Sequence, residues 1–231
     1  MIKFIFIKTF SVIILTLLPC FAAADEFKYL SISFFGKQVG FIKVREASNI
    51  DSKEIHVEGK ISSSPFKVFN GRFKYKTTFT EINSGAPRLH YESSVDAIFK
   101  ERKINYWVKN NRLISVDVLP KREETKLTNP KQIDVNFIDP TYAIIKLLTM
   151  PCKDSFKVYD GRRLIDVIAI ESNSKLECRY LYKIQKGPGH LSPFNFKTLK
   201  ISTYFDQSRN SAFRYMIVKT GPFKLILNQV P

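Results

Sequence analysis

Three histidines are the side chains best suited to metal binding or acid–base catalysis. His56, His90 and His190 are far apart and lack the short spacings that mark zinc sites. His190 lies in the glycine- and proline-rich segment 187–193, so it is the one histidine to test as a base, although an ordinary loop histidine is the favoured interpretation. The chain has no Gly-x-Ser-x-Gly motif and no glycine-rich phosphate loop. These residues therefore predict no metal and no cofactor.

Two pairs of aspartates are the next candidates for acid–base chemistry. Asp134 could act with Asp139, and Asp160 with Asp166. Each of the four also has a structural role available, as a helix cap, in a turn or on a strand face. We therefore predict a protein that is not an enzyme and has no catalytic residues.

The two cysteines beyond the N-terminal segment are Cys152 and Cys178. In an oxidising compartment two such cysteines usually pair, so we predict a disulfide between them. A redox-active pair is disfavoured because the Cys-x-x-Cys spacing is missing. The bond would connect the end of a predicted helix to a strand at 176–186.

The first 24 residues have the features of a secretory signal peptide. Lys3 and Lys8 accompany an apolar run at 11–18, and three alanines follow before the expected cleavage between Ala24 and Asp25. A retained membrane anchor is the alternative, but the apolar run is shorter than the ~20 residues that a spanning helix needs. We expect a periplasmic protein of a Gram-negative bacterium, with no transmembrane segment in the mature chain.

The mature chain is strongly basic. Removing Lys3 and Lys8 from the 37 basic residues leaves 35 against 21 acidic ones, a net charge of +14. An exported protein is not expected to bind nucleic acid, but anionic lipid headgroups or acidic glycans are reasonable partners. The favoured interpretation is that the basic residues occupy the solvated faces of strands and turns, and the alternative is a dedicated anion site. These residues include Lys74, Lys76, Lys100, Arg102, Lys103, Lys121, Arg122, Arg162 and Arg163.

Alternation of apolar and polar residues dominates residues 25–231, which we predict to form a single β-rich domain. Residues 55–61 and 73–79 show the pattern clearly, and turn signals such as Asp160-Gly161 separate the runs. About a dozen strands joined by short turns indicate a curled antiparallel sheet, either an incomplete barrel or a β-spiral. The pattern recurs at 27–35, 38–46, 88–99, 103–109, 112–118, 155–160, 163–171, 177–186, 196–205, 212–219 and 223–229.

One helix is expected, near residues 139–150, and the sheet should curl around it. Asp139 is a good N-cap, Pro140 suits the first helical position, and Pro151 ends the run. Apolar residues occur nearly all round the helix, so it must be buried. The preceding segment 119–138 is predicted to be a polar crossing loop.

Aromatic residues are abundant, with 20 Phe, 10 Tyr and one Trp. Many phenylalanines lie in the inward phase of the predicted strands, including Phe73, Phe79 and Phe99. A packed core is the favoured interpretation. The alternative is an apolar groove for an acyl chain, lined by these three residues on a sheet face that the helix does not fill.

The chain resembles the bacterial periplasmic proteins grouped as domain of unknown function 3108. The resemblance rests on the strand–turn–strand start at 29–40, the Asp-Pro-Thr-Tyr helix at 139–145 and the Asp-Gly-Arg-Arg hairpin at 156–163. It implies a β-rich, barrel-like exported protein and supplies no catalytic residues. In architecture alone, the expected fold is similar to the half-barrels of the periplasmic lipoprotein carrier and its outer-membrane receptor.

Together these features favour a non-enzymatic cell-envelope protein that binds a lipid, lipoprotein or acyl chain in a curved apolar sheet face. The alternative is a scaffold or interaction module for a protein or an anionic glycan. A hydrolase built on His190 is the least favoured function.

Overall fold

The computed structural model describes residues 26–49, 51–62, 70–80, 88–98, 100–134, 136–149, 152, 154–172, 174, 176–190, 195–207 and 212–230. Within these residues, thirteen β-strands form a single antiparallel sheet, accompanied by one α-helix and three 3-10 helices. The prediction of a mainly β protein with one curled antiparallel sheet and one helix is confirmed. The strands are β1 (Glu26–Phe34), β2 (Lys37–Ser48), β3 (Ser52–Ile61), β4 (Gly71–Thr80), β5 (Arg88–Ala97), β6 (Lys100–Lys109), β7 (Arg112–Leu119), β8 (Phe156–Tyr159), β9 (Leu164–Ile170), β10 (Glu177–Lys186), β11 (Thr198–Asp206), β12 (Ala212–Thr220) and β13 (Phe223–Gln229).

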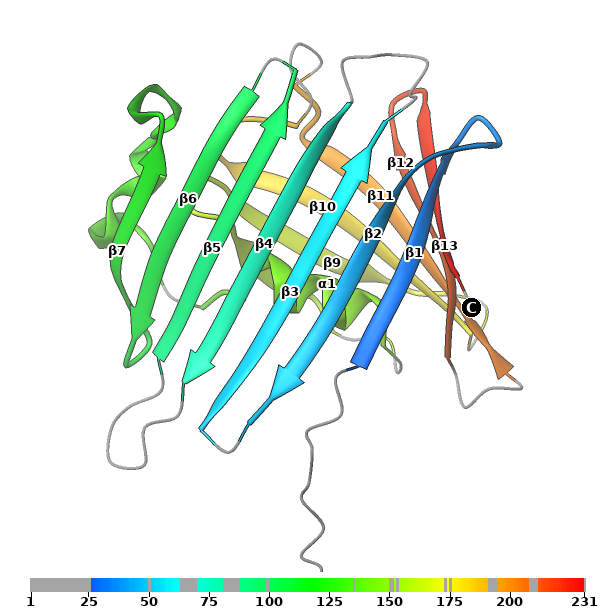
Figure 1. Ribbon diagram of the computed structural model, residues 1–231, viewed down its shortest axis with the longest axis horizontal. Coiled ribbons are helices and arrows are strands. Elements are labelled where there is room, and N and C mark those ends of the chain that lie inside the picture. The colour runs from blue at the N-terminus through cyan, green and yellow to red at the C-terminus, as the bar shows by residue number, and fades with distance from the viewer. Residues whose placement is uncertain are drawn as a thin grey trace, which may run out of the picture.

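The sheet is folded on itself and is not closed. Its strand order is β7-β6-β5-β4-β3-β2-β1-β13-β12-β11-β10-β9-β8, so β1 and β13 pair in the middle. The two halves of the sheet face each other with helix α1 (Pro140–Leu147) between them (Figure 1). The end strands β7 and β8 do not pair with each other within the described residues. The result is a barrel-like fold with an open seam.

Alternating burial sets the inner and outer faces of the sheet. In β6, Ile104, Tyr106 and Val108 are buried, whereas Asn105 and Trp107 between them are exposed. This period of two is the geometry of a pleated strand with one face toward a core. The inner faces therefore carry the apolar side chains and the outer faces carry most of the charge.

Helix α1 begins as predicted. The Asp139 Oδ1 atom accepts hydrogen bonds from the backbone N–H groups of Thr141 (2.9 Å) and Tyr142 (3.1 Å), and Pro140 is the first helical residue. The helix ends earlier than predicted, at Leu147, because the Leu148 N–H reaches the carbonyls of both Ile144 and Ile145 and closes the last turn. Pro151, the predicted stop, lies outside the described residues.

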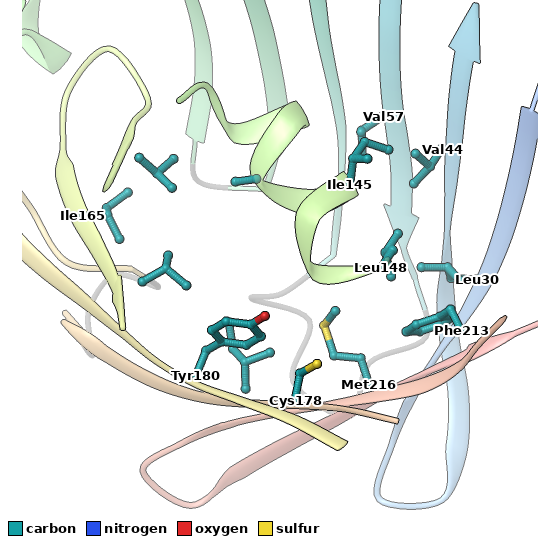
Figure 2. Close-up of a cluster of buried hydrophobic side chains, with 14 of the residues drawn as sticks. Leu30, Val44, Val57, Ile145, Leu148, Ile165, Cys178, Tyr180, Phe213 and Met216 are labelled. Atoms are coloured by element: carbon teal, nitrogen blue, oxygen red, sulfur yellow. The ribbon is translucent and has the colours of Figure 1, made fainter. Parts of the chain in front are cut away.

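The core surrounds the helix. Buried residues from α1 and both halves of the sheet form one cluster, in which Leu148 is 2% exposed and Val57 is 1% exposed. Figure 2 shows Ile145 of the helix and Leu148 at its end beside Val57, Val44 and Leu30 of the first half, with residues of the second half to one side of the helix and below it. Those residues are Ile165, Cys178, Tyr180, Phe213 and Met216.

The segment between β7 and the helix is more structured than a simple loop. It contains the 3-10 helices η2 (Lys121–Glu123), η3 (Lys126–Thr128) and η4 (Pro130–Gln132). Near its end, Ile138 bridges to Val158 in parallel and so covers the outer edge of β8. The segment therefore spans the seam from β7 to β8.

The predicted disulfide is present. Cys152 and Cys178 are bonded, with their Cα atoms 5.3 Å apart. Cys178 lies in β10 and is 1% exposed, so the bond attaches the chain that follows α1 to the second half of the sheet.

Candidate functional site: a cationic cluster at the seam

The site lies where the turn between β8 and β9 packs against β6. Gly161 in this turn has φ +88°, and a Cβ atom there would collide with the side chain of Ile104. The Tyr106 hydroxyl donates to the Tyr159 carbonyl (3.1 Å), and the Tyr159 hydroxyl donates to the Leu127 carbonyl (2.6 Å). Packing and side-chain hydrogen bonds thus close the seam in place of strand pairing.

Six ionisable side chains converge at this seam, and we call them the cationic cluster. They are Lys100, Arg102, Glu123, Asp160, Arg162 and Arg163. Arg102, Arg162 and Arg163 are only 7–8% exposed. Arginines are rarely so deeply buried unless carboxylates neutralise them, so the partners of each charge decide what the cluster can do.

A single carboxylate oxygen serves three of these cations. Glu123 Oε2 lies 3.1 Å from Arg162 Nη1, 3.4 Å from Lys100 Nζ and 3.5 Å from Arg102 Nη1. Arg162 also donates through Nε to the Glu123 carbonyl. Glu123 therefore holds Arg162 closely and the other two cations more loosely.

The second carboxylate is tightly bound to one arginine. Asp160 Oδ2 lies 2.6 Å from both Nε and Nη2 of Arg163, while Asp160 Oδ1 accepts from the backbone N–H groups of Arg162 (3.0 Å) and Arg163 (2.7 Å). Two guanidinium nitrogens thus share one carboxylate oxygen, and charge-assisted hydrogen bonds of this kind are stronger than neutral ones.

His190 joins the cluster through Arg163. The guanidinium Nη1 lies 2.6 Å from His190 Nδ1, and the Tyr182 hydroxyl lies 2.6 Å from His190 Nε2. A guanidinium can only donate, so Nδ1 accepts and the proton of the neutral ring is on Nε2, facing Tyr182. Burial, followed by the Arg163 charge, lowers the pKa of His190 to about 3. His190 is therefore neutral at physiological pH.

The pKa shifts of Glu123, Lys100 and Arg162 show how the charges of the cluster act on one another. Burial alone would raise the pKa of Glu123, but the nearby Arg162, Lys100 and Arg102 charges hold this pKa below its ordinary value. Burial, and then repulsion from Arg102, lower the pKa of Lys100 and of Arg162. The cations thus repel one another, with Arg102 at the centre.

The cluster carries more positive than negative charge. Its four cations and two carboxylates leave an excess of two positive charges. Arg102 Nε is buried and has no hydrogen-bond partner within the described residues. A buried donor without a partner costs about 1–3 kcal/mol, and more for a charged group.

The described residues line cavities near the seam and on the outer face. One of about 460 Å³ is lined by Thr125, Lys126, Leu127, Gln132, Lys186 and Gly187, and one of about 220 Å³ adjoins it and shares Leu127, Gln132 and Lys186. A third, of about 510 Å³, lies over the outward side chains of β3 to β7. None of the three is lined by Phe73 or Phe79.

Of the three phenylalanines predicted to line an apolar groove, two face the core and the third lies outside the described residues. Phe73 and Phe79 face inward from β4 and are partly buried against the main core cluster. Phe73 stacks on Tyr75 (5.2 Å between ring centroids), and Phe79 meets Tyr142 of the helix edge-on (6.1 Å). Phe99, like the predicted cleavage site Ala24–Asp25 and the signal segment 1–24, lies outside the described residues.

The structure brings only one of the three histidines to the seam. His56 and His90 lie on the outer face. His56 Nε2 is 2.9 Å from Glu54 Oε2, and His90 Nε2 is 2.7 Å from Asn105 Oδ1. The described part of the chain holds no group of three metal-ligating side chains. Nor does it contain a helix long and apolar enough to cross a membrane.

The interpretation of all the basic residues as solvated was wrong for Arg102, Arg162 and Arg163. One signal was available, because Arg102 is in phase with the buried residues Ile104 and Tyr106 of its strand. The other two arginines follow a turn, where period-two alternation says nothing about burial. The partnership with Glu123, 39 residues from Arg162, has no local signal.

Comparison with known proteins was made against family models, curated proteins and solved structures. No family model matches the chain, and a search of curated proteins finds no match. Among solved structures, the chain is similar to a crystal structure described as a beta-barrel-like protein of domain of unknown function DUF1849 from Brucella abortus. The TM-score is 0.48 and the identity 10%, over 90% of this chain and 96% of that one. The resemblance to domain of unknown function 3108 stays a prediction.

Proposed function

We propose that this chain is a non-enzymatic, exported protein of the cell envelope that binds an acyl chain of a lipid or lipoprotein. The supporting observation is that many inward-facing apolar side chains are only partly buried, although they lie between two apolar sheet faces. They come from both halves of the sheet and from the helix, and include Ile42, Phe73, Phe79, Tyr142, Ile144, Leu147, Leu199, Val218 and Leu227.

An acyl chain is a suitable ligand for such a surface. Each methylene group that leaves water contributes about 0.8 kcal/mol, so a chain of moderate length that covers these side chains would bind tightly. The seam between β7 and β8 is closed by side-chain contacts, so the two halves could separate there without breaking a pair of adjacent strands.

Native mass spectrometry of the protein purified from the periplasm, followed by solvent extraction, tests the proposal. We expect a mass increment that matches a phospholipid or another acylated molecule. After delipidation, a fluorescent fatty acid should bind again. An apo mass together with no uptake of the fatty acid would count against acyl binding.

Two phenylalanine variants make this test specific. Phe79→Ala removes an inward ring that contacts Tyr142 of the helix. Phe27→Ala is the control, because Phe27 is 63% exposed. We expect only the first variant to reduce fatty-acid uptake, in samples whose unfolding curves show that both are folded. Equal uptake by the two variants would argue against an inner site.

A second candidate function rests on the outer face. The groove of about 510 Å³ there is lined by several lysines, carboxylates and Asn105. Trp107 lies two positions after Asn105 on the same face and is 41% exposed. Its ring stacks on that of His90, with 3.8 Å between the ring centroids. Aromatic rings beside polar side chains suit a glycan partner, as the interaction-module alternative expects. Because Trp107 is the single tryptophan, quenching of its fluorescence by a polyuronate would report binding.

A further inference from the structure

We propose that the cationic cluster is a binding site for a phosphate-type anion, held by Arg102 with Lys100 and Arg162. The proposal goes beyond acyl binding, because it concerns a polar site at the seam. Only its lipid form, in which the phosphate belongs to a headgroup, rests on the proposed function.

The first argument is charge. Three of the four cations are buried arginines. An excess of two positive charges in the cluster is unfavourable, because no counter-charge replaces the hydration that these arginines lose. A phosphate group carries about −1.5 to −2 at neutral pH and offers three strong acceptor oxygens. One bound phosphate would thus balance the excess of the cluster.

The second argument is geometry. Charge-assisted N–H···O contacts are normally about 2.7–2.9 Å long. The 3.4 and 3.5 Å separations from Glu123 to Lys100 and Arg102 exceed this range, whereas Arg163 and Asp160 are 2.6 Å apart. Arg102 Nε has no partner among the described residues at all. Arg102 and Lys100 therefore keep donor capacity for a further acceptor, while Arg163 is already satisfied.

The third argument is access. The side chains of Lys100 and Glu123 are 39% and 23% exposed, whereas that of Arg102 is 9% exposed. An anion can therefore approach from the solvent on the Lys100 side and meet the guanidinium of Arg102 at the inner end. Asp160 is bound to Arg163 at 2.6 Å. Glu123 Oε2 lies 3.1 Å from Arg162 Nη1 and has no hydrogen-bond partner among the described residues, so the three surrounding cations offset its charge toward an incoming anion.

The experiment measures binding of inorganic phosphate to the full mature chain. Calorimetric titration and thermal unfolding are performed in sodium phosphate and in sodium chloride at equal ionic strength. We expect saturable phosphate binding and a higher melting temperature in phosphate, because a ligand of the native state stabilises it. Equal melting temperatures and no binding heat would overturn the proposal without any variant.

Variants then locate the site. Arg102→Gln should weaken phosphate binding about tenfold or more, because it removes the charge and the free Nε–H donor. Arg102→Lys keeps the charge but not the fork of donors, so its affinity should be intermediate. Arg112→Gln is the control, since Arg112 is exposed at the far end of the neighbouring strand β7. Equal losses in Arg102→Gln and Arg112→Gln would assign the binding to general surface charge and refute the site.

Soluble short-chain phosphatidic acid and the corresponding diacylglycerol distinguish the two sources of phosphate. If phosphate and phosphatidic acid both bind and both depend on Arg102, the site holds a lipid headgroup. If only inorganic phosphate binds, the anion site stands and the acyl function fails. If both lipids bind equally and Arg102→Gln changes neither affinity, the acyl function stands and this inference fails.

Discussion

At the scale of single residues, buried polar side chains organise the start of the helix. Asp139 and Thr77 are both 0% exposed, and the Thr77 hydroxyl donates to Asp139 Oδ1 at 2.7 Å. The Thr141 hydroxyl lies 2.5 Å from the same oxygen. One carboxylate oxygen thus links the first turn of α1 to strand β4, so the N-cap also fixes where the helix sits on the sheet.

We predict that Asp139→Ala lowers the free energy of unfolding by about 2–4 kcal/mol. The change removes a helix cap and leaves buried donors without an acceptor. Denaturant unfolding measures the loss. Asp96→Ala, on the exposed face of β5, is the control and should change stability by less than about 0.5 kcal/mol. A similar small loss for both variants would contradict the role assigned to Asp139.

His190 should make stability depend on pH. Its pKa is about 3 in the folded protein and 6.5 when unperturbed, so between these values the unfolded chain binds more protons than the folded one. Stability must therefore fall as pH decreases from about 6.5, at up to about 1.4 kcal/mol per pH unit. Burial and then the Arg163 charge lower the pKa of His190, and the Asp160 charge opposes them. The ring contacts Arg163 and the Tyr182 hydroxyl.

Denaturant unfolding between pH 6.5 and 5 measures this effect. This pH range lies above the range in which the carboxylates of the cluster titrate. Those carboxylates have lowered pKa values, so their contribution is lost only at lower pH. His190→Phe should flatten the slope in the window, whereas His56→Gln should retain it. A slope that persists in His190→Phe would mean that another group is responsible.

At the scale of elements, the disulfide attaches the end of α1 to β10. It closes a loop between residues 26 apart, which typically contributes about 3 kcal/mol through the unfolded state. The Cys152→Ser variant should therefore unfold at a lower temperature and keep the same far-ultraviolet circular dichroism spectrum. Equal melting temperatures of the wild type with and without reductant would contradict this prediction.

At the scale of the whole molecule, the fold depends on how its seam is closed. The first and last strands pair by hydrogen bonds, but the other ends of the two half-sheets meet through the β8–β9 turn and the segment 120–138. The contacts across this seam are side-chain packing, ion pairs, side-chain hydrogen bonds and the backbone bridge between Ile138 and Val158. The seam is therefore joined without the continuous strand pairing of β1 and β13, and the proposed anion site lies at it.

A pair of glycine variants tests the seam. Gly161 and Gly36 both have positive φ, at +88° and +74°, so an alanine is strained at either position. Only at Gly161 would the new methyl group collide with another side chain, that of Ile104, and nothing lies within 4 Å at Gly36. Gly161→Ala should therefore cost about 1–3 kcal/mol more than Gly36→Ala in denaturant unfolding. Equal costs would show that the turn does not pack tightly on β6.

Local features of this fold were predictable from the sequence. Period-two alternation predicts the strands, and Asp139 with Pro140 predicts the start of α1. The Asp-Gly pair predicts the tight turn at 160–161. Each of these features depends on a few neighbouring residues. The disulfide followed from having two cysteines in a chain that the sequence predicts to be exported. The end of α1 was predicted too late, because a double hydrogen bond at Leu148 closes the helix before the sequence signal at Pro151.

The cationic cluster was decided by the tertiary structure alone. By itself the sequence determined which residues alternate, where the helix begins and that the chain is basic. It could not determine that Glu123 meets cations from β6 and from the β8–β9 turn, because that depends on how two half-sheets fold together across the seam. A basic side chain is solvated when it lies on an outer face and is buried when it lies at the seam. Only long-range packing decides which of these environments it occupies.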